Sequence, residues 1–140
     1  MTSHSSSLRR TVAIAAHFAR RLAPGAVVAL EGDLGAGKTQ FARGIVQGLG
    51  GDPRSVSSPT FVLMNIYETP RGKVYHLDAY RISGAEDLEG IGFEEILEQD
   101  GFVLVEWWQK VSAIIPQKHW KVSLTSTSAH GRDIAIEAPE

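Results

Sequence analysis

The spacing of apolar side chains in the first third of the chain predicts a helix, a strand and a second helix. Apolar positions recur at helical spacing in Leu8–Leu22, with arginines on the other faces, and Pro24 follows. The short apolar run Ala26–Leu30 predicts a buried strand that leads into a glycine-rich segment. Apolar positions in Thr39–Leu49 again follow a helical spacing and end at a glycine pair, which predicts the second helix.

The rest of the chain alternates between strand-like and helix-compatible segments. The predicted strands are Phe61–Tyr67, Val74–Asp78, Phe102–Val105, Trp120–Leu124 and Asp133–Glu137. The first two should form a hairpin, the third a central strand, and the last two a closing antiparallel pair. Two acidic segments, 85–91 and 93–99, are compatible with helices. The pattern predicts an α/β fold with a mixed sheet.

Composition narrows the class of protein. The 140 residues are 43% hydrophobic and 21% charged, which is typical of one globular domain spanning 1–140. Residues 1–7 are small and polar, so we expect a disordered leader without a secretion signal. No apolar run approaches the ~20 residues that cross a bilayer, and there is no cysteine, so we expect a soluble, cytoplasmic protein. The net charge of -2 offers no broad positive field, so any contact with RNA should require a partner protein.

Residues Gly32–Thr39 read Gly-Asp-Leu-Gly-Ala-Gly-Lys-Thr and satisfy the P-loop pattern G-x-x-x-x-G-K-[ST]. Glycines let backbone N–H groups converge on a phosphate, and the positive end of the following helix points there too. Lys38 should reach the β- and γ-phosphates, and the Thr39 hydroxyl should bind Mg²⁺. The alternative, a glycine-rich turn with an accidental lysine, fits less well with a strand before and a helix after. We therefore expect a three-layer P-loop NTPase fold, with a mostly parallel sheet flanked by helices.

Hydrolysis would also require a carboxylate at the metal and a group that orients water. Glu106 directly follows the apolar strand, as in a Walker B element with Glu in place of Asp, although such an acid can also be a solvated strand end. Asp78 also ends a strand, where it could orient water, hold a metal-bound water or cap a turn. Ser58-Pro59-Thr60 could sense the γ-phosphate, but the pattern alone favours a simple turn.

Other candidate residues carry weaker signals. His76 is interpreted as a packed or hydrogen-bonded strand residue, because no other histidine lies near it at metal-site spacing. Trp107 and Trp108 could be core, a nucleotide platform or a partner surface, with core packing favoured for at least one. Arg81 and Arg132 could neutralise phosphate or stack on a base, although exposed arginines usually do neither.

Four segments in order resemble the TsaE family, also called YjeE. They are Gly32–Thr39, Ser58–Phe61, His76–Arg81 and Val105–Trp107. The similarity runs from about Thr11 to the final strand. The resemblance implies an ATPase, with Mg²⁺, that is required for threonylcarbamoyladenosine in tRNA. It also implies that TsaD and TsaB transfer the group itself, that this protein meets tRNA only through them, and that hydrolysis resets their complex.

The resemblance further implies roles for individual residues. Lys38 and the loop amides would hold phosphates, Thr39 and Glu106 would hold Mg²⁺, and Asp78 would support hydrolysis, so the catalytic set is Lys38, Asp78 and Glu106. The nucleotide-binding set is Thr11, Asp33, Leu34, Gly35, Ala36, Gly37, Lys38, Thr39, Gln40, Trp107 and Arg132. The chain departs from the family pattern at Trp108, where a Pro or small residue is usual, and at Ala79, where a larger apolar residue is usual. These changes concern partner contacts rather than the phosphate site.

Other P-loop functions stay open at this point. A small-molecule kinase would need an acceptor site under a closing lid, and no Arg-rich lid is evident. A nucleotide-sensing module would order a docking surface without turnover. A GTPase usually carries Asn-Lys-x-Asp, and this tetrapeptide is missing from the sequence. We expect an ATPase that is slow alone and depends on its partners.

Overall fold

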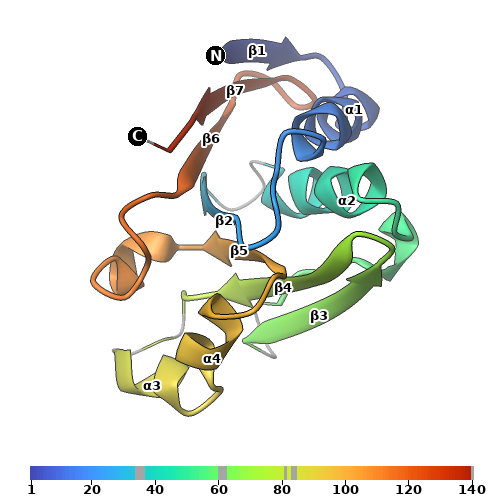
Figure 1. Cartoon of the computed structure of the whole chain (residues 1–140). Helices are drawn as coiled ribbons and strands as arrows, with labels where there is room; N and C mark the ends of the chain where they lie inside the picture. The colour runs from blue at the N-terminus through green and yellow to red at the C-terminus, as the bar shows by residue number, and fades with distance from the viewer. Residues whose placement is uncertain (34–36, 60–62, 81, 83–84, 140) are drawn as a thin grey trace.

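The computed structural model describes residues 1–33, 37–59, 63–80, 82 and 85–139. Within these residues seven strands form one sheet (Figure 1). The strands are β1 (Thr2–Ser5), β2 (Val27–Glu31), β3 (Met64–Thr69), β4 (Gly72–Asp78), β5 (Phe102–Glu106), β6 (Trp120–Ser126) and β7 (Arg132–Glu137). Their order across the sheet is β1-β7-β6-β2-β5-β4-β3.

The sheet is parallel in its middle and antiparallel at both sides. Strands β6, β2, β5 and β4 run parallel to one another. The hairpin partner β3 and the strands β7 and β1 add antiparallel pairs at the two edges. The predicted mixed sheet with an antiparallel C-terminal pair is therefore confirmed. Because the central strands are parallel, their carboxyl ends meet at one edge, where ligands of open α/β sheets bind.

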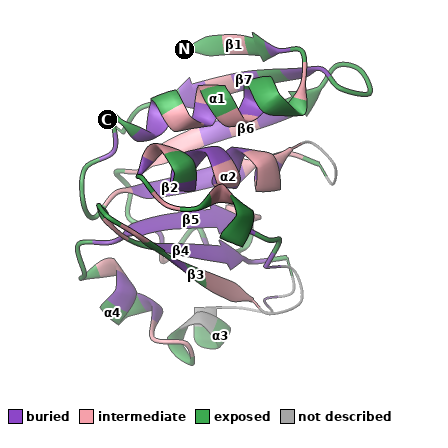
Figure 2. Ribbon diagram, turned by 90° about the vertical axis from the view of Figure 1, so that its right-hand side faces the viewer, coloured by how far each residue is buried: buried purple, intermediate pink, exposed green. Residues whose placement is uncertain are grey.

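Helices cover the two faces of the sheet. Helices α1 (Leu8–Ala19) and α2 (Lys38–Gly48) pack side by side on one face, and the 3₁₀ segment η1 (Pro53–Ser55) follows α2 (Figures 1 and 2). Helix α4 (Phe93–Leu97), preceded by α3 (Ala85–Glu89), and the 3₁₀ segment η2 (Trp108–Val111) contribute to the core on the other face. This arrangement confirms the three layers. In the ranges described, no helix is both long and apolar enough to span a membrane.

Alternation along the central strands divides the core in two. Phe102 and Leu104 of β5 face α1 and α2, whereas Val103 and Val105 belong to the core on the opposite face. All four are buried, as the purple central strands in Figure 2 show. By the same two-residue period, Glu106 continues the face of Phe102 and Leu104. The uniform apolar run thus marks a strand covered on both faces.

The prediction of a disordered leader at residues 1–7 is wrong. Thr2–Ser5 forms β1, an edge strand that pairs antiparallel with β7. Ser7 is the N-cap of α1, and its hydroxyl accepts a hydrogen bond from the N–H of Arg10 at 3.1 Å. Main-chain pairing with β7 and the buried Ser5 hydroxyl hold this strand. Neither requires apolar alternation, so the side-chain pattern did not reveal it.

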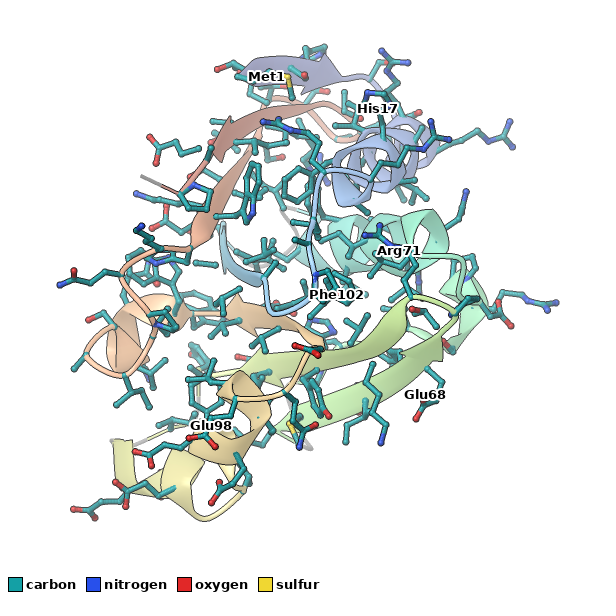
Figure 3. The ribbon with its side chains drawn as sticks, in the orientation of Figure 1. Met1, His17, Glu68, Arg71, Glu98 and Phe102 are labelled. Atoms are coloured by element: carbon teal, nitrogen blue, oxygen red, sulfur yellow. The ribbon has the colours of Figure 1, made fainter. Side chains whose placement is uncertain are left out.

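The β3–β4 turn is tied to the end of α1 by Arg71. Its guanidinium donates to the carbonyl of Leu22 at 2.7 Å and to that of Ala19 at 3.3 Å. It also lies 5.6 Å from the centroid of the Phe102 ring, and Figure 3 shows the two side chains in the same region. The Ala19 carbonyl also accepts from the N–H of Leu22 at 3.1 Å, so the Arg71 cation adds to the hydrogen bonds at the end of the helix.

Candidate functional site

The junction between β2 and α2 forms the start of the site. β2 ends at Glu31 and α2 begins at Lys38, with Gly37 as its N-cap in a left-handed conformation at φ 99°. A glycine N-cap has no side chain to occupy the N–H groups of the first turn, so these groups remain suited to an anion. The predicted loop residues Leu34, Gly35 and Ala36 lie outside the described residues.

A cavity of about 410 Å³ lies at this helix end and brings distant segments together. It is lined by Leu8, Gly37, Lys38, Thr39, Gln40, Ser58, Asp78, Glu106, Trp107 and Arg132. We call it the P-loop pocket. It unites most of the described residues that were predicted for nucleotide binding, catalysis or metal binding. Asp33 is exposed and lines a second, adjoining cavity, which shares Trp107 with the first.

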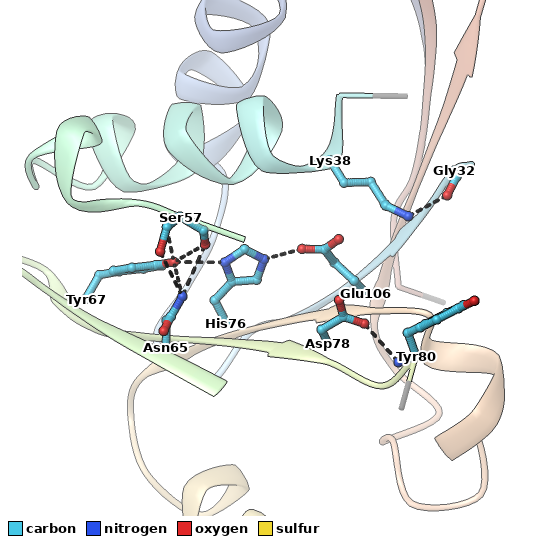
Figure 4. Close-up of polar contacts among 9 residues, drawn as sticks. All are labelled: Gly32, Lys38, Ser57, Asn65, Tyr67, His76, Asp78, Tyr80 and Glu106. Carbon is cyan, nitrogen blue, oxygen red and sulfur yellow. Dashed lines mark hydrogen bonds and ion pairs between the residues drawn. The ribbon is translucent and has the colours of Figure 1, made fainter. Parts of the chain in front are cut away.

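The amino group of Lys38 points across the mouth of the loop. Its Nζ donates to the carbonyl oxygen of Gly32 at 2.5 Å (Figure 4). The same atom lies 4.3 Å from the centroid of the Trp107 ring. Burial of the side chain lowers the pKa of Lys38 from its usual value, and the nearby carboxylates of Glu106 and Asp78 oppose that shift. Because burial disfavours the charged amine, an incoming anion such as a phosphate would stabilise it more than it would stabilise a solvated lysine.

The two predicted carboxylates end neighbouring parallel strands. In the β4–β5 register Asp78 is paired with Glu106, and each residue is only 3% exposed. The N–H of Ala79 donates to the Glu106 carbonyl at 2.9 Å, and Asp78 Oδ1 accepts from the N–H of Tyr80 at 2.8 Å. These bonds fix both acids at the carboxyl edge of the sheet, on the side of α2.

His76 binds Glu106, and the sequence did not reveal this contact. His76 Nε2 lies 2.6 Å from Glu106 Oε2, and the imidazole is fully buried (Figure 4). The interpretation of His76 as a hydrogen-bonded strand residue is confirmed. Its partner lies 30 positions away, so spacing could not identify it. A signal was present, however, because His76 lies two positions before Asp78 and therefore on the same face of the strand.

The two adjacent tryptophans point to different surroundings. Trp107 adopts a left-handed conformation, with φ 57°. Its ring lines the P-loop pocket and lies 5.0 Å from that of Tyr80. Trp108 instead donates its indole N–H to Glu31 Oε1 at 3.1 Å. Trp107 therefore faces the P-loop pocket, whereas Trp108 braces the turn against the end of β2.

Arg132 and Thr11 differ in how they meet the pocket. Arg132 is 6% exposed, lines the pocket and donates to the Gly131 carbonyl at 2.7 Å. Thr11 is fully buried, and its hydroxyl lies 2.8 Å from Ser5 Oγ and 3.2 Å from the Ser7 carbonyl. Its side chain is thus hydrogen-bonded inside the protein, and its contact with nucleotide stays a prediction. Leu8, one turn earlier in α1, lines the pocket instead.

Two predicted site residues, Thr60 and Arg81, lie outside the described residues.

The predicted Mg²⁺ ligands lie together in the structure. Thr39 and Glu106 face the same pocket with oxygen ligands of the kind that Mg²⁺ prefers. Across the described ranges, no three His, Cys, Asp or Glu side chains gather into a metal site of their own. The donor set fits a Mg²⁺ ion that completes its coordination with phosphate oxygens and water, as in P-loop proteins.

Fold and site together define the class as a P-loop nucleotide-binding protein. The family profile described as "Threonylcarbamoyl adenosine biosynthesis protein TsaE" matches residues 5–134. The chain belongs to the TsaE family. Two similar relatives are both described as "tRNA threonylcarbamoyladenosine biosynthesis protein TsaE". That of Rickettsia prowazekii is 40% identical over 84% of this chain and 81% of its own length. That of Bacillus subtilis is 38% identical over 91% and 79%.

A solved structure supports the same assignment. The crystal structure of YdiB from Bacillus subtilis matches with a TM-score of 0.78 at 30% sequence identity. The match covers 100% of this chain and 86% of the other. The likeness therefore extends over the whole sheet and its helices, including the edge strand that the sequence pattern did not predict.

Proposed function

We propose that this chain is a Mg²⁺-dependent ATP hydrolase that acts in the biosynthesis of threonylcarbamoyladenosine in tRNA. Membership of the TsaE family supports the pathway. The observation that carries the proposed chemistry is the P-loop pocket, where Lys38 and Thr39 meet Asp78 and Glu106. A phosphate-binding cation, a hydroxyl and two carboxylates at one edge of a parallel sheet are the groups that phosphoryl transfer requires.

Each of these side chains has a distinct proposed role. Lys38 exchanges its bond to the Gly32 carbonyl for phosphate oxygens, with the N–H groups of the first turn of α2 beside it. Thr39 and Glu106 hold the Mg²⁺ ion, which neutralises charge on the phosphates when bound. Asp78, fixed by the N–H of Tyr80, orients the attacking water. Arg132 adds positive charge from the start of β7.

The free protein is expected to turn over slowly. Lys38 already has a carbonyl partner and an aromatic ring beside it, so nucleotide must displace these contacts. We propose that the TsaB and TsaD proteins favour the arrangement that hydrolyses ATP, and that tRNA is reached in the cytoplasm through them. The overall charge of -2 agrees with an indirect contact with tRNA. A small-molecule kinase and a nucleotide-sensing module without turnover are the alternatives.

The test is ATP hydrolysis by the purified wild type, Lys38→Ala and Glu106→Gln, each with and without the TsaB and TsaD proteins. We expect hydrolysis that requires Mg²⁺, is stimulated by the pair, and falls at least ~100-fold in both variants. Lys73→Ala is the matched control, because Lys73 is half-exposed and lies 3.8 Å from Glu68, far from the pocket lining. If Glu106→Gln cannot hydrolyse ATP but still supports the function of TsaB and TsaD, the result would favour the sensing module. If Lys38→Ala still hydrolyses ATP, and TsaB and TsaD do not stimulate hydrolysis, the result would contradict the proposal.

A further inference from the structure

A chain of buried polar side chains runs behind the P-loop pocket. Glu106 Oε2 lies 2.6 Å from His76 Nε2, and His76 Nδ1 lies 3.1 Å from the Tyr67 hydroxyl (Figure 4). That hydroxyl in turn lies 2.9 Å from the carbonyl oxygen of Ser57. Glu106, His76 and Tyr67 are each no more than 5% exposed. Because water does not compete for these groups, their mutual geometry is strongly determined.

Chemistry sets the direction of the hydrogen bonds. An ionised carboxylate only accepts, so the Nε2 of His76 carries the proton that faces Glu106. In the neutral ring Nδ1 is then an acceptor for the Tyr67 hydroxyl. The single hydroxyl proton has two acceptors within reach, His76 Nδ1 and the Ser57 carbonyl. The Asn65 amide donates to the same carbonyl at 3.2 Å and keeps it paired when the proton faces His76. The hydroxyl thus has two discrete arrangements.

The far end of this chain returns to the pocket. We call residues Val56–Pro59 the Ser57 loop. Ser58 of this loop lines the P-loop pocket, so the loop and Glu106 are two walls of one cavity. The loop is held in part through Tyr67 itself, because the Ser57 N–H donates to the Tyr67 hydroxyl at 3.3 Å and that hydroxyl lies against the Ser57 carbonyl. Arg43 and Asn65 hold it as well, by donating to the Val56 carbonyl at 3.3 Å and to the Ser57 hydroxyl at 3.2 Å. A change at one wall can therefore reach the other through His76 and Tyr67.

We propose that His76 is a positioning residue for Glu106 and that the His76–Tyr67 pair couples this carboxylate to the Ser57 loop. The inference rests on the proposed function in one respect, namely that Glu106 responds to the bound metal and nucleotide. When Glu106 turns toward them, the hydrogen bond that it accepts from His76 changes. The Tyr67 hydroxyl then redistributes between His76 and Ser57, and the loop wall responds.

Tyr67→Phe tests the coupling, because it removes the hydroxyl and keeps the ring. Tyr75→Phe is a matched control: Tyr75 is also 5% exposed, but it faces the opposite core and its hydroxyl bonds to Gln99. Amide hydrogen exchange of the Ser57 loop is measured with and without ATP and Mg²⁺. We expect the wild type and the control to show a nucleotide-dependent change of roughly tenfold, which Tyr67→Phe loses while its ATP affinity changes less than about threefold.

Variants of His76 test the positioning role. His76→Gln keeps an N–H donor for Glu106, whereas His76→Ala does not. We expect kcat to fall in His76→Ala with KM for ATP little changed, and to be partly rescued in His76→Gln. Equal loss of kcat and of thermal stability in both variants would indicate a merely structural histidine and overturn this role.

The outcomes separate the coupling from the proposed function. The coupling would be overturned if hydrogen exchange of the Ser57 loop did not change with nucleotide in the wild type, or if it still changed in Tyr67→Phe. Neither result would affect the proposed hydrolase activity, provided that the wild type hydrolyses ATP. The wild type could instead bind ATP without hydrolysing it and still show a nucleotide-dependent change in the Ser57 loop that requires Tyr67. That result would support the coupling and contradict the proposed hydrolase activity. Wild type that neither binds nor hydrolyses ATP would contradict both.

Discussion

Charged side chains crowd the P-loop pocket with little access to water. Lys38, Asp78 and Glu106 are each no more than 6% exposed, and the last is bonded to the fully buried His76. Burial disfavours the charge on Lys38, and the nearby carboxylates offset this only in part. That balance explains why the pKa of Lys38 is lowered even though three carboxylates surround it. Phosphates would replace the missing solvation of the ammonium group.

The lowered pKa of Lys38 predicts how nucleotide binding depends on pH. Phosphate favours the protonated amine, so affinity for ADP should fall as pH rises through the lowered pKa, starting below the ordinary value of 10.5. The stability of the free protein moves the other way, because in that range the unfolded chain binds more protons. ADP affinity measured over a series of rising pH values below 10.5 should decline in the wild type and stay flat in Lys38→Met. Equal slopes in both proteins would contradict this origin.

The hydrogen bonds of Glu31, which lies outside the P-loop pocket, predict a contribution to the stability of the fold. Its Oε1 accepts from Trp108 at 3.1 Å and from Gln109 at 2.8 Å, and its Oε2 accepts from Ser123 at 3.0 Å. Glu31→Ala should lower the free energy of unfolding by about 1–3 kcal/mol, because three donors lose their acceptor. Urea unfolding measures this. Glu68→Ala, which removes an exposed ion pair, should cost less than ~1 kcal/mol, and an equal loss would argue against the bracing role of Glu31.

At the residue scale the sequence predicted the residues that line the pocket better than the residues that hold them in place. The P-loop spacing and the acid after an apolar strand singled out Lys38, Thr39 and Glu106, and all three line one cavity. Their roles in binding and hydrolysis stay predictions. These residues follow from short local patterns. The contacts that hold them in place do not follow from local patterns, because His76 and Glu106 are 30 positions apart and Trp108 and Glu31 are 77 positions apart. Only the register of the folded sheet brings such pairs together.

At the scale of elements, α1 and α2 approach so closely that glycine is required in α2. A Cβ at Gly44 would lie 2.4 Å from the Val12 carbonyl oxygen, and one at Gly48 would lie 2.3 Å from that of Ala16. Gly→Ala usually stabilises a helix by about 0.5–1 kcal/mol, but here it should destabilise by about 1–3 kcal/mol. Thermal unfolding of both variants checks the sign. Gln47→Ala, on the exposed side of the same helix, should be near neutral, and a stabilised Gly48→Ala would contradict this packing.

Helices and central strands were predictable because each repeats its pattern over at least five residues. Helix α1 was predicted over 8–22 and ends at Ala19, while β5 matches its apolar run and adds Glu106. The strand predicted at Phe61–Tyr67 is shifted in the structure to Met64–Thr69, with residues 61 and 62 outside the described part. β1 was missed entirely. Edge strands pair through backbone groups that any sequence supplies, so side-chain alternation does not report them.

At the scale of the whole molecule, β1 connects the far edge of the sheet to the P-loop pocket. Its last residue, Ser5, is paired with Arg132 in the β1–β7 register. The hydroxyl of Ser5 also lies 2.8 Å from that of Thr11 in α1. Leu8 and Arg132 both line the pocket, so two of its walls depend on the position of this strand. An element without a chemical group at the site thereby shapes the site.

Removal of residues 2–6 should therefore weaken nucleotide binding as well as folding. The deletion leaves Thr11 with a buried hydroxyl lacking its Ser5 partner, and it unpairs the edge of β7 next to Arg132. We expect a loss of about 1–3 kcal/mol in stability and a loss of roughly threefold to tenfold in ADP affinity. Thermal unfolding and ADP titration, done well below the unfolding midpoint, measure both. A truncation after Glu137, beyond the end of β7, is the control and should change neither quantity. Full ADP affinity in the folded deletion variant would show that β1 supports the sheet without shaping the pocket.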